Sequence, residues 1–247
     1  MSKYGWRPDR PDFRDLMLAP PPQDLPSEVD LRGQMPEVYN QGDIGSCTAN
    51  AIAAAFDFER GRQGMDFINP SRLFIYYNER LIEGDVSYDG GAQIRDGVKA
   101  VSKIGVVPEG MWPYIEADLY TEPPQQIYDA ASDDLVLEYR RVNPAHIRYV
   151  LAQGFPVIFG FTVFDSFMSI GSDGVMPLPQ PDDAVDGGHA VLATGYTQVG
   201  GDPHFIVRNS WGEDWGDQGY FYMPFPVISV PGMASDFWVI RKVEEEQ

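Results

Sequence analysis

The chain contains a single cysteine, Cys47, so no disulfide bond can form within its 247 residues. A fold of this length must then be held by its hydrophobic interior, and 43% hydrophobic with 13% aromatic residues is ordinary for a globular protein. The N-terminal residues have no apolar signal-peptide core, and no stretch approaches the length of a membrane span. These features predict a soluble protein of a reducing compartment, the cytoplasm, or alternatively a protein exported without a visible signal.

Acidic residues outnumber basic ones, which gives a formal net charge of −19 and a pI of about 4.3. This charge disfavours nucleic acids and anionic membranes as partners. The three histidines and the one cysteine have no spacing typical of a zinc site, so neither a metal nor an organic cofactor is expected.

The environment of Cys47 favours a reactive thiol. A glycine-containing turn precedes it, and the alanine-rich residues 49–60 predict a helix that begins at the cysteine, with Ser46 as its N-cap. The free amide groups at a helix N-terminus stabilise a thiolate and lower the cysteine pKa. Gln41 supplies a side-chain amide donor a few residues upstream. The alternative is a lone buried cysteine with a structural role, which is the commonest state of free cysteines.

Two later segments supply the partners that a thiol nucleophile needs. His189 lies at the head of an apolar strand, directly after Gly188, and an imidazole has a pKa suited to a general base. Asn209 ends a second predicted strand and precedes Ser210 and Trp211, so its amide oxygen is available to orient an imidazole. The other two histidines have no comparable motif around them.

Three segments together resemble the papain-like cysteine peptidases, in a bacterial-type form with a short N-terminal segment. They occur in the family's order, and about 140 residues separate the cysteine from the histidine, as in papain-type enzymes. The segments are Gln41-Gly42-Asp43-Ile44-Gly45-Ser46-Cys47, Asp186-Gly187-Gly188-His189-Ala190-Val191 and Val207-Arg208-Asn209-Ser210-Trp211-Gly212.

The resemblance implies a catalytic triad of Cys47, His189 and Asn209. It also implies an oxyanion hole formed by the Gln41 side chain and the Cys47 backbone N–H, with Trp211 shielding the histidine–asparagine pair from water. The implied reaction is hydrolysis of internal peptide bonds through a thioester. Two alternatives remain open: an acyl transferase that uses the same triad, and a latched member of the family that binds peptides without hydrolysing them.

Three glycines are candidates for substrate binding by the same resemblance, namely Gly90, Gly91 and Gly188, because a missing side chain lets another backbone approach closely. The chain also departs from the family. Ile44 stands where a second cysteine is common, Thr48 begins a stretch that lacks the usual aromatic residues, and Gly188 replaces an aspartate or asparagine. These differences concern stability and substrate preference rather than the catalytic groups.

The expected fold class is α+β, with the two-lobe papain-like architecture and the active site in the cleft between the lobes. Residues 28–247 are predicted to form the peptidase domain, with a mainly helical lobe at about 28–122 and a mainly antiparallel, barrel-like β lobe at about 123–247. Helices are expected at residues 47–60, 71–83, 92–103 and 145–153. Strands are expected at residues 135–142, 154–163, 189–196, 204–209, 219–223 and 236–242.

Residues 1–27 precede this domain and are rich in proline, aspartate and arginine. The proline-rich residues 19–26 favour an extended or polyproline path. One interpretation of this segment is a mobile tail or a strap laid on the surface. The other is a short inhibitory latch across the cleft or its rim, anchored by Tyr4, Trp6 and Phe13. The expected partners are therefore polypeptide substrates and the chain's own N-terminal segment, and the protein is expected to be a monomer.

Overall fold

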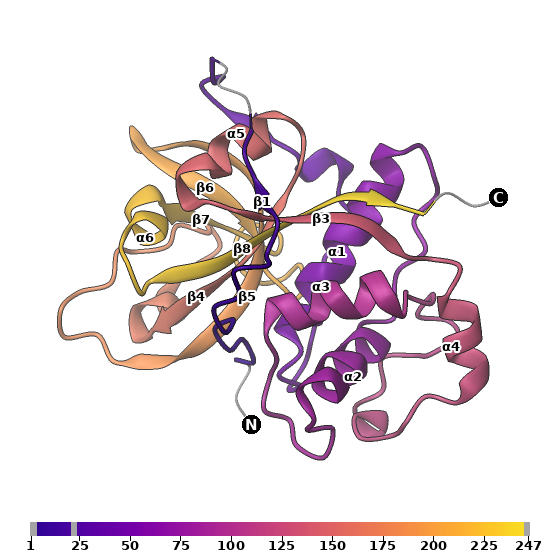
Figure 1. The fold of residues 1–247 in the computed structure, drawn as a ribbon. Coiled ribbons are helices and arrows are strands. Elements are labelled where there is room, and N and C mark those ends of the chain that lie inside the picture. The colour runs from indigo at the N-terminus through magenta and orange to yellow at the C-terminus, as the bar shows by residue number, and fades with distance from the viewer. Residues whose placement is uncertain (1–3, 21–23, 245–247) are drawn as a thin grey trace.

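The computed structural model describes residues 4–20 and 24–244, which form an α+β fold with helices packed against one large sheet (Figure 1). The α-helices are α1 (Cys47–Arg62), α2 (Arg72–Glu83), α3 (Ile94–Lys103), α4 (Gln125–Ala131), α5 (Ile147–Ala152) and α6 (Phe225–Ser229). The 3₁₀ helices are η1 (Arg32–Gln34), η2 (Glu116–Asp118), η3 (Pro144–His146) and η4 (Asp165–Ser169). Within the described part of the chain, no helix is long and apolar enough to span a membrane.

The strands form one eight-stranded sheet in the order β1-β3-β8-β4-β5-β6-β7, with β2 added to β5. The strands are β1 (Met17–Leu18), β2 (Val29–Asp30), β3 (Val136–Val142), β4 (Val157–Phe164), β5 (Val185–Val199), β6 (Asp202–Arg208), β7 (Tyr220–Pro224) and β8 (Ala234–Val243). All pairs are antiparallel except β1 with β3. Among the described strands no pairing joins β1 to β7, so the expected barrel-like lobe is an open sheet.

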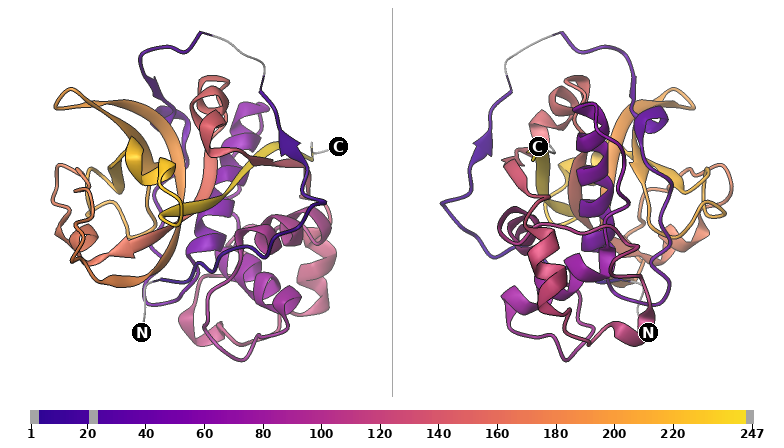
Figure 2. Two further views of the ribbon diagram at one scale, coloured as in Figure 1. Left: turned by 60° about the vertical axis from the view of Figure 1, so that its left-hand side comes forward. Right: turned by 90° about the vertical axis from the view of Figure 1, so that its right-hand side faces the viewer.

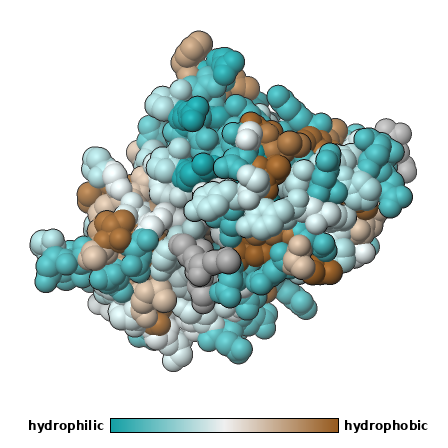
Figure 3. All heavy atoms as spheres, turned by 90° about the horizontal axis from the view of Figure 1, so that it is seen from below, coloured by the Kyte–Doolittle hydropathy of each residue, from teal (hydrophilic) through white to brown (hydrophobic). Residues whose placement is uncertain are grey.

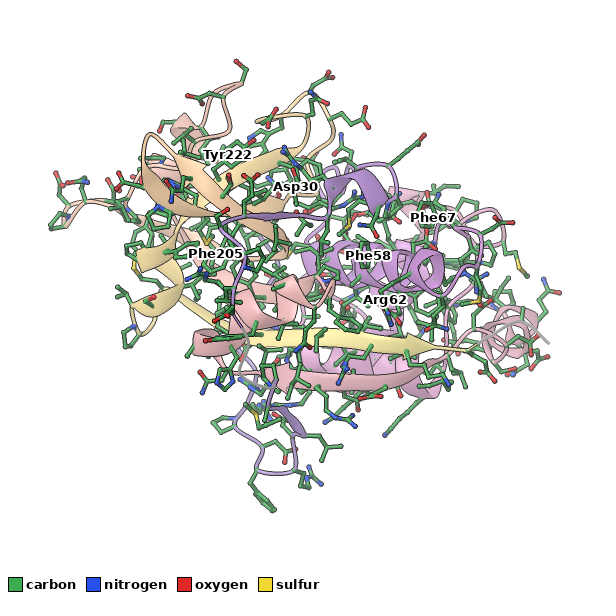
Figure 4. The ribbon with its side chains drawn as sticks, turned by 90° about the horizontal axis from the view of Figure 1, so that it is seen from above. Asp30, Phe58, Arg62, Phe67, Phe205 and Tyr222 are labelled. Carbon is green, nitrogen blue, oxygen red and sulfur yellow. The ribbon has the colours of Figure 1, made fainter. Side chains whose placement is uncertain are left out.

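Helix α1 runs through the middle of the molecule and carries the cysteine at its first position. All of residues 47–60 are buried, which explains why this helix has no polar stripe. Phe56 packs in a core shared with α2 and α3, whereas Phe58 packs in the core beneath the sheet. Figure 4 shows Phe58 and Arg62 on this helix, with Phe205 and Tyr222 on the sheet side. Helix α1 therefore joins the two cores.

Helices α2 and α3 begin and end close to where the sequence predicts. The Ser71 hydroxyl accepts a hydrogen bond from Phe74 N (3.1 Å), which caps the start of α2, and Gly84 ends the helix in the left-handed conformation (φ 80°). Hydrophobic residues of α3 recur on one face and are buried, including Ile94, Val98 and Val101.

The sequence did not predict every element. The polar, proline-containing residues 120–124 lead directly into α4, which was not predicted and whose Ile127 and Ala131 are buried. Helix α6 and the short strands β1 and β2 were also not predicted. Each of these elements is short and depends on tertiary packing rather than on its own periodicity, because α4 packs against Phe74 of α2 and Val107, whereas α6, β1 and β2 lie against or within the sheet. Seen from below, exposed hydrophobic residues form separate groups among polar ones (Figure 3).

Residues 4–18, which we call the strap, cross the molecule between the helices and the sheet before β1 pairs with β3 (Figures 1 and 2). Trp6 forms an isolated parallel bridge with Ala92, and Met17 lies opposite Arg141. Residues 21–23 of the proline-rich stretch lie outside the described residues. The strap is thus hydrogen-bonded to both parts of the fold rather than extending as a separate tail.

Candidate active site

Cys47 lies at the start of α1 with its side chain fully buried. Its Sγ accepts a hydrogen bond from the backbone N–H of Ala190 in β5 (3.3 Å). Ser46 occupies the N-cap position, as predicted, but its side chain makes no capping hydrogen bond. The Ser46 hydroxyl instead lies 2.6 Å from the Tyr114 hydroxyl and accepts from Asn50 Nδ2 (3.0 Å). The competing side-chain partners explain the missing cap.

Gln41 connects the cysteine loop to the loop that follows β6. Its Nε2 donates to the carbonyl of Ile44 (2.9 Å), and its Oε1 accepts from the Ser210 hydroxyl (2.6 Å). The Gln41 backbone N–H donates to the Ser210 carbonyl (2.9 Å). These bonds hold the side-chain amide of Gln41 inside the turn that leads to Cys47.

His189 and Asn209 are brought together by the register of β5 and β6. His189 lies in β5, and Asn209 directly follows β6, which pairs with β5 through Leu192 and Arg208. His189 Nε2 is 2.8 Å from Asn209 Oδ1, and Nδ1 is buried without a hydrogen-bond partner among the described residues. Nδ1 is therefore the nitrogen left to exchange a proton.

Aromatic rings enclose the imidazole. The ring centroid of Trp211 lies 5.1 Å from that of His189. Phe161 of β4 lies opposite His189 in the β4–β5 pairing, and its ring centroid is 5.9 Å away. Neither ring carries a charge. The histidine–asparagine pair is therefore screened from water on these sides, which strengthens its hydrogen bond.

Burial keeps both reactive groups neutral in this structure. It raises the pKa of the Cys47 thiol to about 12, although backbone amides of Ala190 and Gly5 oppose the rise. Burial also lowers the pKa of the His189 imidazole to about 4, against its bond to Asn209. The prediction of a lowered cysteine pKa is thus wrong for this state, because loss of water outweighs the helix N-terminus.

The strap is the element that covers the thiol. The Gly5 backbone hydrogen-bonds to Cys47, and the Gly5 carbonyl accepts from Ala92 N (2.7 Å). Trp6 N donates to the carbonyl of Gly188 (3.0 Å), the residue before the histidine. A side chain on Gly5 would overlap the backbone of Gly45, so only glycine fits above the cysteine turn.

The arrangement agrees with a family model described as papain family cysteine protease, which matches residues 25–237. The chain belongs to the papain family of cysteine proteases. A curated relative from Acanthamoeba polyphaga mimivirus, an uncharacterized peptidase C1-like protein, is 41% identical over 98% of this chain and 88% of its own length. A cathepsin B-like protein of Giardia intestinalis is 32% identical over 79% of this chain and 68% of its own.

Solved structures of papain-family proteins share the fold. Xylellain, a cysteine protease from Xylella fastidiosa, superposes with a TM-score of 0.92 at 44% identity, covering 98% of this chain and 97% of that one. Procathepsin L 3 of Tenebrio molitor superposes at 0.72 with 20% identity, covering 91% and 73%. The predicted papain-like α+β fold is confirmed, and the protein is a cysteine-type peptidase.

Two of the three glycines predicted to bind substrate lie against the strap of this papain-family protein. A side chain on Gly91 would overlap the Gly5 carbonyl, and one on Gly188 would collide with the backbone and ring of Trp6. Gly90 instead lies against the Tyr88 ring. Of the predicted strap anchors, Trp6 is buried (8% exposed), whereas Phe13 is 99% exposed and anchors nothing. The Tyr4 ring lies 6.1 Å from that of His189.

Sequence reasoning missed two carboxylates that hold the cysteine turn. Asp89 accepts hydrogen bonds from Gly45 N (3.1 Å) and from the Tyr76 hydroxyl (2.6 Å). Glu79 is fully buried and accepts from the hydroxyl of Thr48 (2.6 Å), the residue after Cys47. Asp89 directly precedes the two glycines, which is the signal that could have found it. The described residues include no cluster of three His, Cys, Asp or Glu side chains able to hold a metal.

Proposed function

We propose that this protein is an endopeptidase that hydrolyses peptide bonds through Cys47, His189 and Asn209. The observation that carries the proposal is the bond from His189 Nε2 to Asn209 Oδ1, which leaves Nδ1 to serve a thiol that is held at a helix N-terminus. Asn209 thereby fixes the tautomer and the ring orientation of the imidazole.

In the proposed reaction, His189 Nδ1 takes the thiol proton and Cys47 Sγ attacks the peptide carbonyl. The oxyanion is held by the Cys47 N–H and by Gln41 Nε2. To reach the oxyanion, Gln41 Nε2 gives up its hydrogen bond to the Ile44 carbonyl. His189 gives its proton to the departing amine, which leaves an acyl thioester on Cys47. A water molecule, deprotonated by His189, then releases the acid and restores the thiol.

The strap supports a closed resting state of this enzyme. Gly5 presents its N–H to the thiol, while its carbonyl is turned to Ala92. When the strap leaves, water and substrate reach both groups, and the desolvation that holds the thiol and the imidazole neutral is relieved. Ion-pair formation between Cys47 and His189 then becomes possible. The N-terminal segment is thus proposed as an inhibitory partner of the domain that follows it.

Activity against an unstructured protein such as casein tests this function. Gly5→Ala displaces the strap and is expected to raise the rate of new N-terminus formation at least tenfold over the wild type. Cys47→Ala in the Gly5→Ala background abolishes it, and Phe13→Ala, a change in the exposed part of the strap, leaves the wild-type rate unaltered.

Two results would contradict the proposal. Adducts that increase with added amine, without hydrolysis, would indicate an acyl transferase. Peptide affinity without turnover in the Gly5→Ala variant would indicate a binding protein.

A further inference from the structure

A basic side chain of the strap occupies an acidic site beside the proposed cleft. The Arg7 guanidinium forms an ion pair with Glu83, the last residue of α2, and its Nη2 also donates to the carbonyl of Gly91 (3.1 Å). Both partners belong to the peptidase domain, so they remain when the strap leaves. The Glu83 side chain is 6% exposed and that of Arg7 is 48% exposed.

Glu83 is held in place by the protein itself. Its Oε1 accepts a hydrogen bond from the backbone N–H of Gln93 (2.6 Å), just before α3. This bond fixes the carboxylate toward the strap and leaves its other oxygen for the guanidinium. A carboxylate that is preorganised, and that its bound partner desolvates, binds a cation more strongly than a mobile, exposed one does.

The position of Arg7 along the strap indicates which residue of a substrate would contact Glu83. Gly5 lies at the thiol, Trp6 fills the space against Gly188 and Gly160, and Arg7 follows. A substrate that runs in the direction opposite to the strap, with its scissile carbonyl at Cys47, would place the first residue before the scissile bond where Gly5 lies and the second at the Trp6 site. Its third residue before the scissile bond would then reach Glu83.

Other charged side chains line the surface pocket that contains Arg7 and Glu83. Asp96 and Lys99 of α3 line it with Arg10, and Arg95 is directed toward Asp15 of the strap (Nε to Oδ1, 3.0 Å). Glu83 is the carboxylate that pairs directly with Arg7, whereas Asp96 interacts with Arg7 only at longer range. This difference makes Asp96 a matched control.

We propose that Glu83 selects an arginine or lysine three residues before the scissile bond, and that Arg7 of the strap occupies this site in the closed enzyme. The inference rests on the proposed peptidase function and adds a substrate class to it: peptides that carry a basic side chain next to a bulky apolar one. The same residue would contribute both to retention of the strap and to choice of substrate.

The test compares two peptides that differ only in arginine or citrulline, its uncharged counterpart, at that third position. The enzyme carries Gly5→Ala and Arg7→Ala, which displace the strap and remove the competing guanidinium. We expect about a tenfold higher kcat/KM for the arginine peptide. Adding Glu83→Gln should reduce the preference to about twofold or less, while adding Asp96→Asn should retain it. Equal rates for the two peptides, or a preference that Glu83→Gln leaves intact, would overturn the proposal.

Binding separates this inference from the peptidase function. The same background with Cys47→Ala is titrated with acetyl-Tyr-Gly-Trp-Arg-Pro-amide, which reproduces residues 4–8, and with its citrulline counterpart. About tenfold tighter binding of the arginine peptide, lost in Glu83→Gln, supports the site even if no peptide is cleaved. Equal affinities contradict it even if casein is hydrolysed.

Discussion

At the residue scale, the reactivity of Cys47 depends on whether water reaches it. The helix N-terminus and the Ala190 amide both favour a thiolate, yet burial raises the thiol pKa to about 12. Burial acts in the opposite direction on His189 and lowers its pKa to about 4. The same residues therefore form a neutral pair under the strap and, in our proposal, an ion pair without it.

Replacement of Gln41 tests the proposed oxyanion hole. In a strap-displaced Gly5→Ala enzyme, Gln41→Ala should lower kcat by about 10²–10³-fold, because one oxyanion donor is lost. KM should change little, since the donor acts mainly on the transition state. Steady-state assays with one peptide give both constants. Gln63→Ala, which is remote on the C-terminal side of α1, serves as the control, and an unchanged kcat in Gln41→Ala would exclude the assigned role.

Glu79 predicts a dependence of stability on pH. Burial raises its pKa to about 8, from an ordinary value of 4.5. Between these values the folded protein holds one more proton than the unfolded chain, so the free energy of unfolding falls as pH rises, by up to about 1.4 kcal/mol per pH unit. This stabilisation is fully present below pH 4.5 and is lost as pH rises through 8.

Glu79→Gln removes this titration and keeps an acceptor for Thr48. The melting temperature of the wild type should therefore fall relative to that of the variant between pH 5 and pH 8. Thermal unfolding of both proteins across this range measures the difference, with the exposed Glu28→Gln as control. Parallel pH profiles would show that Glu79 does not titrate there.

At the element scale, the closed position of the strap depends on the bulky side chain of Trp6. Trp6 is buried against Gly160 and Gly188. Trp6→Ala removes most of this apolar contact, and we expect peptidase activity to rise at least tenfold because the closed state becomes less favourable. Initial rates on a quenched peptide measure the effect. A rate equal to that of the wild type would mean that Trp6 does not retain the strap.

Long elements with clear periodicity or end signals could be predicted from the sequence, and the strap's path could not. Ser71 and Gly84 mark the ends of α2 because their local chemistry suffices. The alternating and β-branched runs predicted β3 to β8 for the same reason. The hydrogen bonds of Gly5 to Ala92 and of Trp6 to Gly188 join residues more than 80 positions apart along the chain, and no local pattern encodes such pairing.

The candidate site likewise contains some residues that the sequence could predict and others that it could not. Cys47, His189 and Asn209 lie in motifs with recognisable neighbours, so sequence reasoning could single them out. Glu83 ends an ordinary amphipathic helix, and only the folded chain brings Arg7 to it. The neutral state of the thiol was missed because it depends on burial by a distant segment rather than on the residues around Cys47.

At the scale of the whole molecule, a buried charge cluster ties the strap to both parts of the fold. Asp9 accepts from Arg95 N (3.0 Å) at the start of α3 and from Trp238 Nε1 (2.9 Å) in β8. Arg141 of β3 pairs with Asp9 (3.3 Å) and with Asp236 (2.8 Å). Burial and the neighbouring Asp236 raise the pKa of Asp9 to about 6. Arg141, which also pairs with Asp15 (3.1 Å), therefore balances these acidic groups together with Arg95, which lies 3.9 Å from Asp9.

Removal of this cation should destabilise the fold in a pH-dependent way. Arg141→Met is expected to lower the free energy of unfolding by about 2 kcal/mol at pH 7, because it removes the cation paired with Asp236 and leaves Asp9 with Arg95 alone, at 3.9 Å. The loss should be smaller at pH 5, below the pKa of Asp9, where that carboxyl is protonated. Urea unfolding at the two pH values measures it, with Arg14→Met on the exposed strap as control. A loss that grows toward pH 5 would contradict the assignment.

The most direct test of a masked cysteine–histidine pair is the rate of Cys47 alkylation by iodoacetamide from pH 4 to pH 9, compared between the wild type and Gly5→Ala. We predict slow labelling of the wild type throughout this range, and rapid labelling of Gly5→Ala that persists well below pH 8.5, the ordinary thiol pKa. Fast labelling of the wild type at pH 6 would contradict the closed state. Labelling of Gly5→Ala that rises only near pH 8.5 would contradict the ion pair itself.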